Sequence, residues 1–105
     1  SYIPKFSTAF SNNKITNIYQ TKSNLLNAYV LVEQNNITEL QKQLSNAEQA
    51  FLPIINDISS QNANQSNINK AYILIKELQN YTNNDDKDVF YIKYKNLIQE
   101  LNNIE

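Results

Sequence analysis

The chain of 105 residues contains no cysteine, histidine, arginine, glycine, methionine or tryptophan. Without histidine and cysteine it lacks the usual pairs of nucleophile and base, and also the ordinary protein ligands of zinc and haem. Without glycine it cannot form the usual phosphate-binding loop, in which the backbone must approach the phosphate closely. We therefore predict that the protein is not an enzyme and that it binds no cofactor and no metal.

The charge is nearly balanced, with a net value of −1, and all nine cations are lysines. Nucleic-acid-binding domains are normally strongly basic. The segment Lys93–Lys95 interleaves lysine with an aromatic residue, as single-strand-binding surfaces do, but Tyr94 fits the period of a helix core. We therefore predict no binding of nucleic acid.

Long apolar runs are absent. The longest contain five residues, Ala28–Val32 and Ala71–Ile75, whereas a membrane-spanning helix needs about 20. We predict that this chain does not span a membrane.

Asparagine and isoleucine are the most frequent residues, with 19 and 13 copies, and there are 9 glutamines. This composition is typical of AT-rich genomes, and it is similar to that of small helical lipoproteins of Gram-positive bacteria. The resemblance covers the whole chain but includes no diagnostic motif, so it assigns a role to no residue. It implies an extracytoplasmic protein with a lipid or membrane anchor upstream of Ser1.

Apolar residues recur every three or four positions in four stretches, which is the period of an amphipathic helix. Because short connections favour antiparallel neighbours, we predict one all-α domain over residues 1–105, an up-down-up-down four-helix bundle of two αα-hairpins. The helices are expected at about 12–34, 38–58, 67–82 and 86–104. The expected inward-facing residues are Ile15, Ile18, Tyr19, Leu25, Leu26 and Tyr29 in the first helix; Leu40, Leu44, Ala47, Phe51, Ile54 or Ile55, and Ile58 in the second; Ile68, Ala71, Tyr72, Ile75 and Leu78 in the third; and Phe90, Tyr94, Leu97, Leu101 and Ile104 in the fourth.

The connections carry turn and capping signals. Asn35 and Asn36 break the first helical pattern, and Thr38 with Gln41 has the form of a capping box. The polar segment 59–66 predicts a loop. Pro53 cannot donate a helical hydrogen bond, but the apolar period continues in phase past it. We therefore predict one helix over 38–58 that is kinked at Pro53, with a separate helix that starts at Pro53 as the alternative.

The N-terminal segment 1–11 has two interpretations. Phe6 and Phe10 lie four residues apart, so the segment could form a short helix that covers the core. Alternatively, it is an aromatic collar next to a membrane anchor.

An internal similarity links segment 24–34 (NLLNAYVLVEQ) to segment 67–77 (NINKAYILIKE), at an offset of 43 residues. Each copy is followed by two asparagines and a second amphipathic helix. Duplication of a hairpin and chance similarity within a restricted alphabet both remain open.

Few charged residues could form a site. Asp85, Asp86 and Asp88 lack the spacing of a calcium loop, so we predict that they cap the last helix, with a weak cation site as the alternative. Lys22 falls on the apolar stripe of the first helix, and either pairs with Glu48 or extends its ammonium group into water.

Excess apolar surface is the strongest functional indication. Leu31, Ile73 and Ile92 are expected to point away from the core stripes of their helices. They either form a surface for a protein partner or for self-association, or they are isolated surface residues. The tyrosines at 19, 29, 72 and 94 are expected either to line a ligand cavity or to lie at the edge of the bundle.

Together these features predict a non-catalytic helical binding or structural module. We expect it to be the soluble extracytoplasmic part of a small secreted or lipid-anchored bacterial protein. A small intracellular adaptor or immunity-type protein that acts through one helix face is the alternative.

Overall fold

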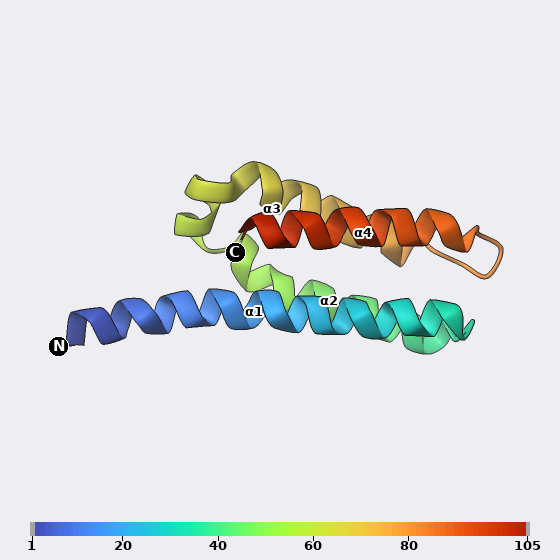
Figure 1. Ribbon diagram of the computed structural model, residues 1–105, viewed down its shortest axis with the longest axis horizontal. Helices are drawn as coiled ribbons and strands as arrows, with labels where there is room; N and C mark the ends of the chain where they lie inside the picture. The colour runs from blue at the N-terminus through green and yellow to red at the C-terminus, as the bar shows by residue number, and fades with distance from the viewer. Residues whose placement is uncertain (1, 105) are drawn as a thin grey trace.

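The computed structural model of the chain is a bundle of four α-helices (Figure 1). They are α1 (Tyr2–Glu33), α2 (Ile37–Ile55), α3 (Ile58–Gln79) and α4 (Lys87–Ile104). The structure describes the backbone of residues 2–104 and the side chains of residues 14–57 and 64–104. No strand occurs within residues 2–104, so the predicted all-α four-helix bundle is confirmed.

The bundle is an elongated body of 54 × 23 × 17 Å. α1 packs most closely on α2, and α3 on α4, whereas α1 and α4 make the least extensive contact of the four neighbouring pairs. α1 is the longest helix, and its N-terminal turns project beyond the other three (Figure 1). Among the residues described, none of the helices is long and apolar enough to cross a membrane, as predicted.

α1 therefore includes the backbone of residues 2–11, which were expected as a separate extension or a short helix. The interpretations of Phe6 and Phe10 concern side chains that lie outside the described residues.

The α1–α2 turn depends on an asparagine in a left-handed conformation. Asn35 has φ 57°, its N–H bonds to the carbonyl of Val32, and the N–H of Asn36 bonds to the carbonyl of Leu31. This is the Schellman arrangement, in which glycine is usual and asparagine is the next choice. The Asn36 side chain then caps α2 by accepting a bond from the Glu39 N–H. The predicted capping box at Thr38 was wrong, because the N-cap is Asn36, two residues earlier.

The α2–α3 connection is shorter than predicted. Pro53 lies inside α2, as predicted, so no new helix starts there. The predicted end at residue 58 was wrong, because α2 ends at Ile55 and is capped by Asn56. Segment 59–66, predicted as a loop, has a helical backbone that is interrupted at Asn64 (φ −135°, ψ 29°). A polar helical segment shows no apolar period, and for this reason it resembles a loop in the sequence.

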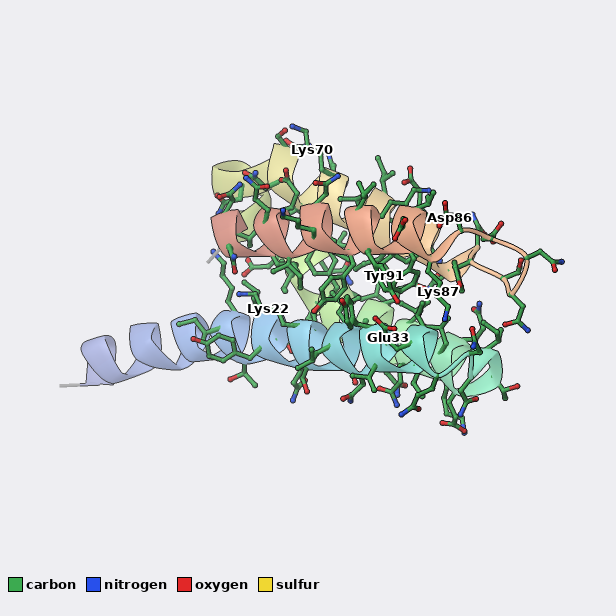
Figure 2. The ribbon with its side chains drawn as sticks, turned by 45° about the vertical axis from the view of Figure 1, so that its right-hand side comes forward. Lys22, Glu33, Lys70, Asp86, Lys87 and Tyr91 are labelled. Atoms are coloured by element: carbon green, nitrogen blue, oxygen red, sulfur yellow. The ribbon has the colours of Figure 1, made fainter. Side chains whose placement is uncertain are left out.

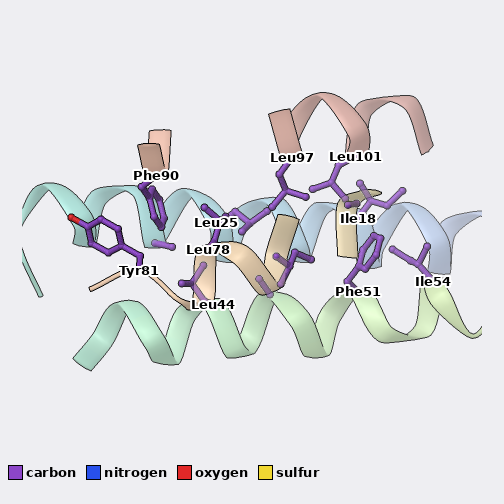
Figure 3. Close-up of a cluster of buried hydrophobic side chains, with 14 of the residues drawn as sticks. Ile18, Leu25, Leu44, Phe51, Ile54, Leu78, Tyr81, Phe90, Leu97 and Leu101 are labelled. Atoms are coloured by element: carbon purple, nitrogen blue, oxygen red, sulfur yellow. The ribbon is translucent and has the colours of Figure 1, made fainter. Parts of the chain in front are cut away.

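One contiguous core runs between all four helices (Figure 3). Most predicted core positions of α2 and α4 are confirmed, with Leu44, Phe51, Leu97 and Leu101 fully buried. Ile58, predicted in the second helix, begins α3, and its side chain lies outside the described residues. Tyr72 and Tyr94, at the edges, are half-buried. Among the side chains that the structure describes, the buried residues are Ile18, Thr21, Leu25, Ala28, Val32, Leu40, Leu44, Ala47, Phe51, Ile54, Ile68, Ala71, Ile75, Leu78, Tyr81, Phe90, Leu97, Leu101 and Ile104.

The core stripe of α1 differs from the predicted one. The buried stripe passes through Thr21, whose hydroxyl donates to the carbonyl of Asn17 at 2.7 Å; this bond lets a hydroxyl occupy a core position. Ile15, Tyr19 and Leu26, which were expected inside, are exposed.

The two hairpins repeat each other at an offset of 50 residues. α2 begins at residue 37 and α4 at residue 87. Buried positions coincide at this offset: Ile18, Thr21, Leu25, Ala28, Leu40, Ala47, Phe51 and Ile54 correspond to Ile68, Ala71, Ile75, Leu78, Phe90, Leu97, Leu101 and Ile104. The offset of 43 seen in the sequence differs from this one by a single heptad. A shift of seven residues returns to the same face of a helix. Segments 24–34 and 67–77 therefore have the same apolar pattern, although the residues that correspond in the structure lie seven positions further along.

Candidate interaction surface

α1 carries a second apolar stripe that faces solvent. Ile15, Tyr19, Leu26 and Val30 are 39%, 57%, 56% and 45% exposed, and we call these four residues the α1 face. At 100° per residue they fall within an arc of about 60°, so they share one side of the helix. Their steps of four, seven and four residues are those of a helix surface that packs against another element.

The second hairpin shows that the fold does not require apolar residues at these positions. At the offset of 50, the α1 face corresponds to Gln65, Asn69, Lys76 and Asn80 of α3. All four are exposed and all four are polar. Equivalent positions on equivalent helices therefore differ in chemistry although the core register is the same.

The two contacts that join the hairpins also differ in chemistry, since one is polar and the other is aromatic. In the contact between α2 and α3, Glu48 accepts hydrogen bonds from Lys76 (2.8 Å), Gln79 (2.8 Å) and the Tyr72 hydroxyl (3.2 Å). The bond from Lys76, followed by that from Gln79, lowers the pKa of Glu48, and the same carboxylate raises the pKa of Lys76.

In the contact between α1 and α4, aromatic rings take the place of this polar network. The ring of Tyr29 lies 4.8 Å from that of Tyr91 and 5.1 Å from that of Tyr94. Tyr29 and Tyr91 correspond at the offset of 50 to Gln79 and Gln41, two residues that hydrogen-bond in the α2–α3 contact. The aromatic side chains hold α1 and α4 further apart than α2 and α3.

Tyr91 carries a buried hydroxyl that makes no hydrogen bond. Its side chain points from α4 toward α1, on the side of Glu33 (Figure 2). Burial, and after it the neighbouring Glu33 carboxylate, raise the pKa of Tyr91 to about 12. The group remains a neutral phenol at physiological pH.

Lys22 does not pair with Glu48. Its ammonium group extends toward α4 and donates to the side-chain oxygen of Asn102 at 2.5 Å (Figure 2), while Glu48 faces α3. Of the two alternatives for Lys22, the ion pair is not formed, because Lys22 lies on the side of α1 that faces α4, whereas Glu48 of α2 bonds to residues of α3.

The three residues predicted for partner contact have different environments. Leu31 is half-buried and packs against the core, so the expectation that it points away from the core was wrong. Ile73 and Ile92 are exposed, at 56% and 61%, and lie on α3 and α4. Their role in partner contact remains a prediction, and it competes with that of the α1 face, which the experiments below distinguish from it. The sequence did not reveal the α1 face, because Ile18 and Leu25 recur with a similar period on the adjacent, buried side of α1. Apolar residues of both sides were therefore assigned to a single core stripe.

The acidic cluster caps the last helix, as predicted. Asp86 accepts from the N–H of Asp88 at 2.9 Å, and Asp85 accepts from the N–H and the hydroxyl of Thr82. Among the side chains described, no three acidic groups gather where they could hold a metal ion. A hollow of about 260 Å³ lies beside this turn, above Tyr81 and Phe90.

Burial, Asp85 and Asp86 raise the pKa of Tyr81 at this hollow. The tyrosines considered for a cavity lie at the bundle edges: Tyr72 bonds Glu48, Tyr29 and Tyr94 pack together, and Tyr19 is exposed.

Comparison with family models, with curated proteins and with solved structures gives no match. The geometry of the chain itself therefore carries the functional argument.

Proposed function

We propose that this chain is a non-catalytic helical binding module that docks onto another protein chain through the α1 face. The observation that carries this proposal is the contrast between the two hairpins: four exposed positions are apolar on α1 and polar at the equivalent places on α3. Exposed apolar surface is unfavourable by roughly 25 cal/mol per Å² relative to burial. A contiguous patch of this kind marks an interaction site more often than scattered single residues do.

The shape of the surface supports a protein partner. The four side chains project from one side of a regular helix, the arrangement by which amphipathic helices pack against a groove or another helix. Tyr19 adds an amphipathic ring, a residue type enriched at the centre of interfaces. No carboxylate lies in the sequence between Ile15 and Val30, and Glu33 borders the surface only at its C-terminal end, so the surface suits an apolar partner better than a cation. The net charge of −1 gives no support for nucleic acid as the partner.

The cellular location belongs to the same proposal. The composition of the chain supports an extracytoplasmic module of a small secreted or lipid-anchored bacterial protein. An intracellular adaptor that acts through α1 is the alternative. The gene sequence upstream of Ser1 distinguishes them, because a lipoprotein signal with its lipidated cysteine there would support the first. An initiator methionine a few residues upstream would support the second.

Site-specific photo-crosslinking in the producing cell tests the docking surface. A photoreactive residue at position 26 is compared with one at position 73, because Leu26 and Ile73 are exposed to the same extent, 56%. We expect a discrete crosslinked product from position 26 and none from position 73. Equal crosslinking at both positions, or none at either, would exclude the α1 face as the docking site.

A further inference from the structure

We infer that the partner of the α1 face is a second copy of this chain, packed antiparallel about a two-fold axis that passes between positions 22 and 23. This inference rests on the proposed function, since it names the occupant of the same surface. It makes the protein a homodimer in which two α1 helices meet.

The spacing of the α1 face is the first reason. The steps from Ile15 to Tyr19, to Leu26 and to Val30 are four, seven and four residues, and this series is the same in both directions. A two-fold interface needs such a surface, because residue i must meet residue j of the partner while j meets i. In the antiparallel register Ile15 meets the partner's Val30, and Tyr19 meets the partner's Leu26.

The charged residues near the face favour the antiparallel direction. Glu33 is exposed and lies at the C-terminal end of the same side of α1. Parallel pairing would place the two Glu33 carboxylates side by side, whereas antiparallel pairing sends them to opposite ends of the interface. The antiparallel direction also brings opposite ends of the two helix dipoles together.

The centre of the interface is open to close approach. Ser23 is small and exposed, and it lies next to the axis. Lys22 lies on the other side of the axis, and its bond to Asn102 holds the ammonium group toward α4. The ammonium group also lies 5.9 Å from the centroid of the Tyr19 ring. In a dimer each Lys22 charge therefore borders the edge of the contact, where Asn102 and the Tyr19 ring of its own chain hold it.

The size of the face predicts a weak dimer. Four partly exposed side chains present a few hundred Å² per copy, less than the roughly 800 Å² per partner of a standard stable interface. We therefore expect concentration-dependent dimerisation, with a dissociation constant on the order of 100 µM.

Sedimentation equilibrium provides the first test. The wild type is expected to dimerise as its concentration rises, and Leu26→Lys is expected to weaken the dimer by about tenfold or more. Lysine is the residue that α3 carries at the equivalent position, so this variant should fold, and circular dichroism checks that it does. Ile73→Lys is the matched control and should dimerise like the wild type.

Because the chain has no cysteine, a single introduced thiol tests the register. In the proposed dimer the two Ser23 positions lie within the ~4.4–6.8 Å Cα spacing of a disulfide, so Ser23→Cys should oxidise readily to a covalent dimer. Ser45→Cys, on an exposed position of α2, should not. Adding Leu26→Lys should slow the linkage of Ser23→Cys by about tenfold.

The outcomes separate this inference from the proposed function. A wild type that stays monomeric near 1 mM (about tenfold above the expected constant), together with a crosslink from position 26 to a different protein, would overturn the homodimer and leave the docking surface intact. No crosslink and no dimer would remove both. Equal linkage of Ser23→Cys and Ser45→Cys would show random collision and would refute the two-fold arrangement.

Discussion

Replacement of Phe51 by alanine tests whether the two hairpins share one core. Phe51 is fully buried on α2 and belongs to the same cluster as Leu97 and Leu101 of α4 (Figure 3). Removal of a buried phenylalanine side chain typically costs 3–5 kcal/mol through lost burial and the cavity that remains. For a domain of this size that is about a third or more of the total free energy of unfolding, roughly 5–15 kcal/mol.

A shared core makes a second, less obvious prediction. Leu101→Ala, at the equivalent position of the other hairpin, should cost about 2–5 kcal/mol and should shift the same single unfolding transition. Phe51→Leu, which gives α2 the residue that α4 carries at this position, should cost only about 1 kcal/mol. Leu26→Ala is the surface control and should change the free energy of unfolding by less than about 0.5 kcal/mol.

Urea unfolding followed by far-ultraviolet circular dichroism measures these changes. The midpoint should fall in both core variants while the denaturant slope stays that of the wild type. Two separate transitions, of which Phe51→Ala shifts only the one from the first hairpin, would refute the single core. A cost below about 1 kcal/mol for Phe51→Ala would refute the burial of this ring.

Three further variants test the polar and turn contacts. Glu48→Gln should destabilise the bundle by about 1–2 kcal/mol at neutral pH. Folding lowers the pKa of Glu48 from its ordinary value of 4.5. The stabilisation by the Glu48 carboxylate is therefore complete above pH 4.5 and is lost as the pH falls through the lower pKa of the folded state. Urea unfolding at several pH values should show the difference from the wild type vanish in acid. Asn35→Ala should cost about 1 kcal/mol because alanine lacks asparagine's tolerance of the left-handed conformation, and Asn35→Gly should be at least as stable as the wild type by the same measurement. Tyr91→Phe should leave stability unchanged or raise it by up to about 1 kcal/mol, since it removes an unpaired buried hydroxyl, and spectrophotometric titration should lose one phenol with a pKa of about 12.

The sequence predicted the cores of α2 and α4 because each helix has a single apolar stripe. On α2 the steps of three and four from Leu40 to Ile54 leave one solution for the inward face, and the structure follows it. α1 has two apolar stripes, and hydrophobic periodicity cannot decide which of them faces the partner helices. The choice depends on Thr21, which fills a core position although its side chain is polar.

The helix boundaries were less predictable for a different reason. Segment 59–66 has no apolar period, and its helical backbone is a property of the folded bundle that no local pattern indicates. The α1–α2 turn was placed correctly, but its geometry depends on the backbone conformation of Asn35. In a chain without glycine, several asparagines could have taken that position, and the sequence does not distinguish them.

The internal repeat provides what a set of homologues would otherwise provide, namely a comparison of the same fold with two sequences. Where the two hairpins agree in chemistry, as at Leu25 and Ile75, the fold accounts for the residue. Where they differ at exposed positions, as at Tyr19 and Asn69, the fold requires neither residue. The apolar residues of the α1 face belong to this second class, and exposed aliphatic side chains favour association over solution. The comparison needs the offset of 50, which becomes visible only when burial is known, because at the sequence offset of 43 Leu26 would be compared with Asn69 and Tyr19 with Asn62.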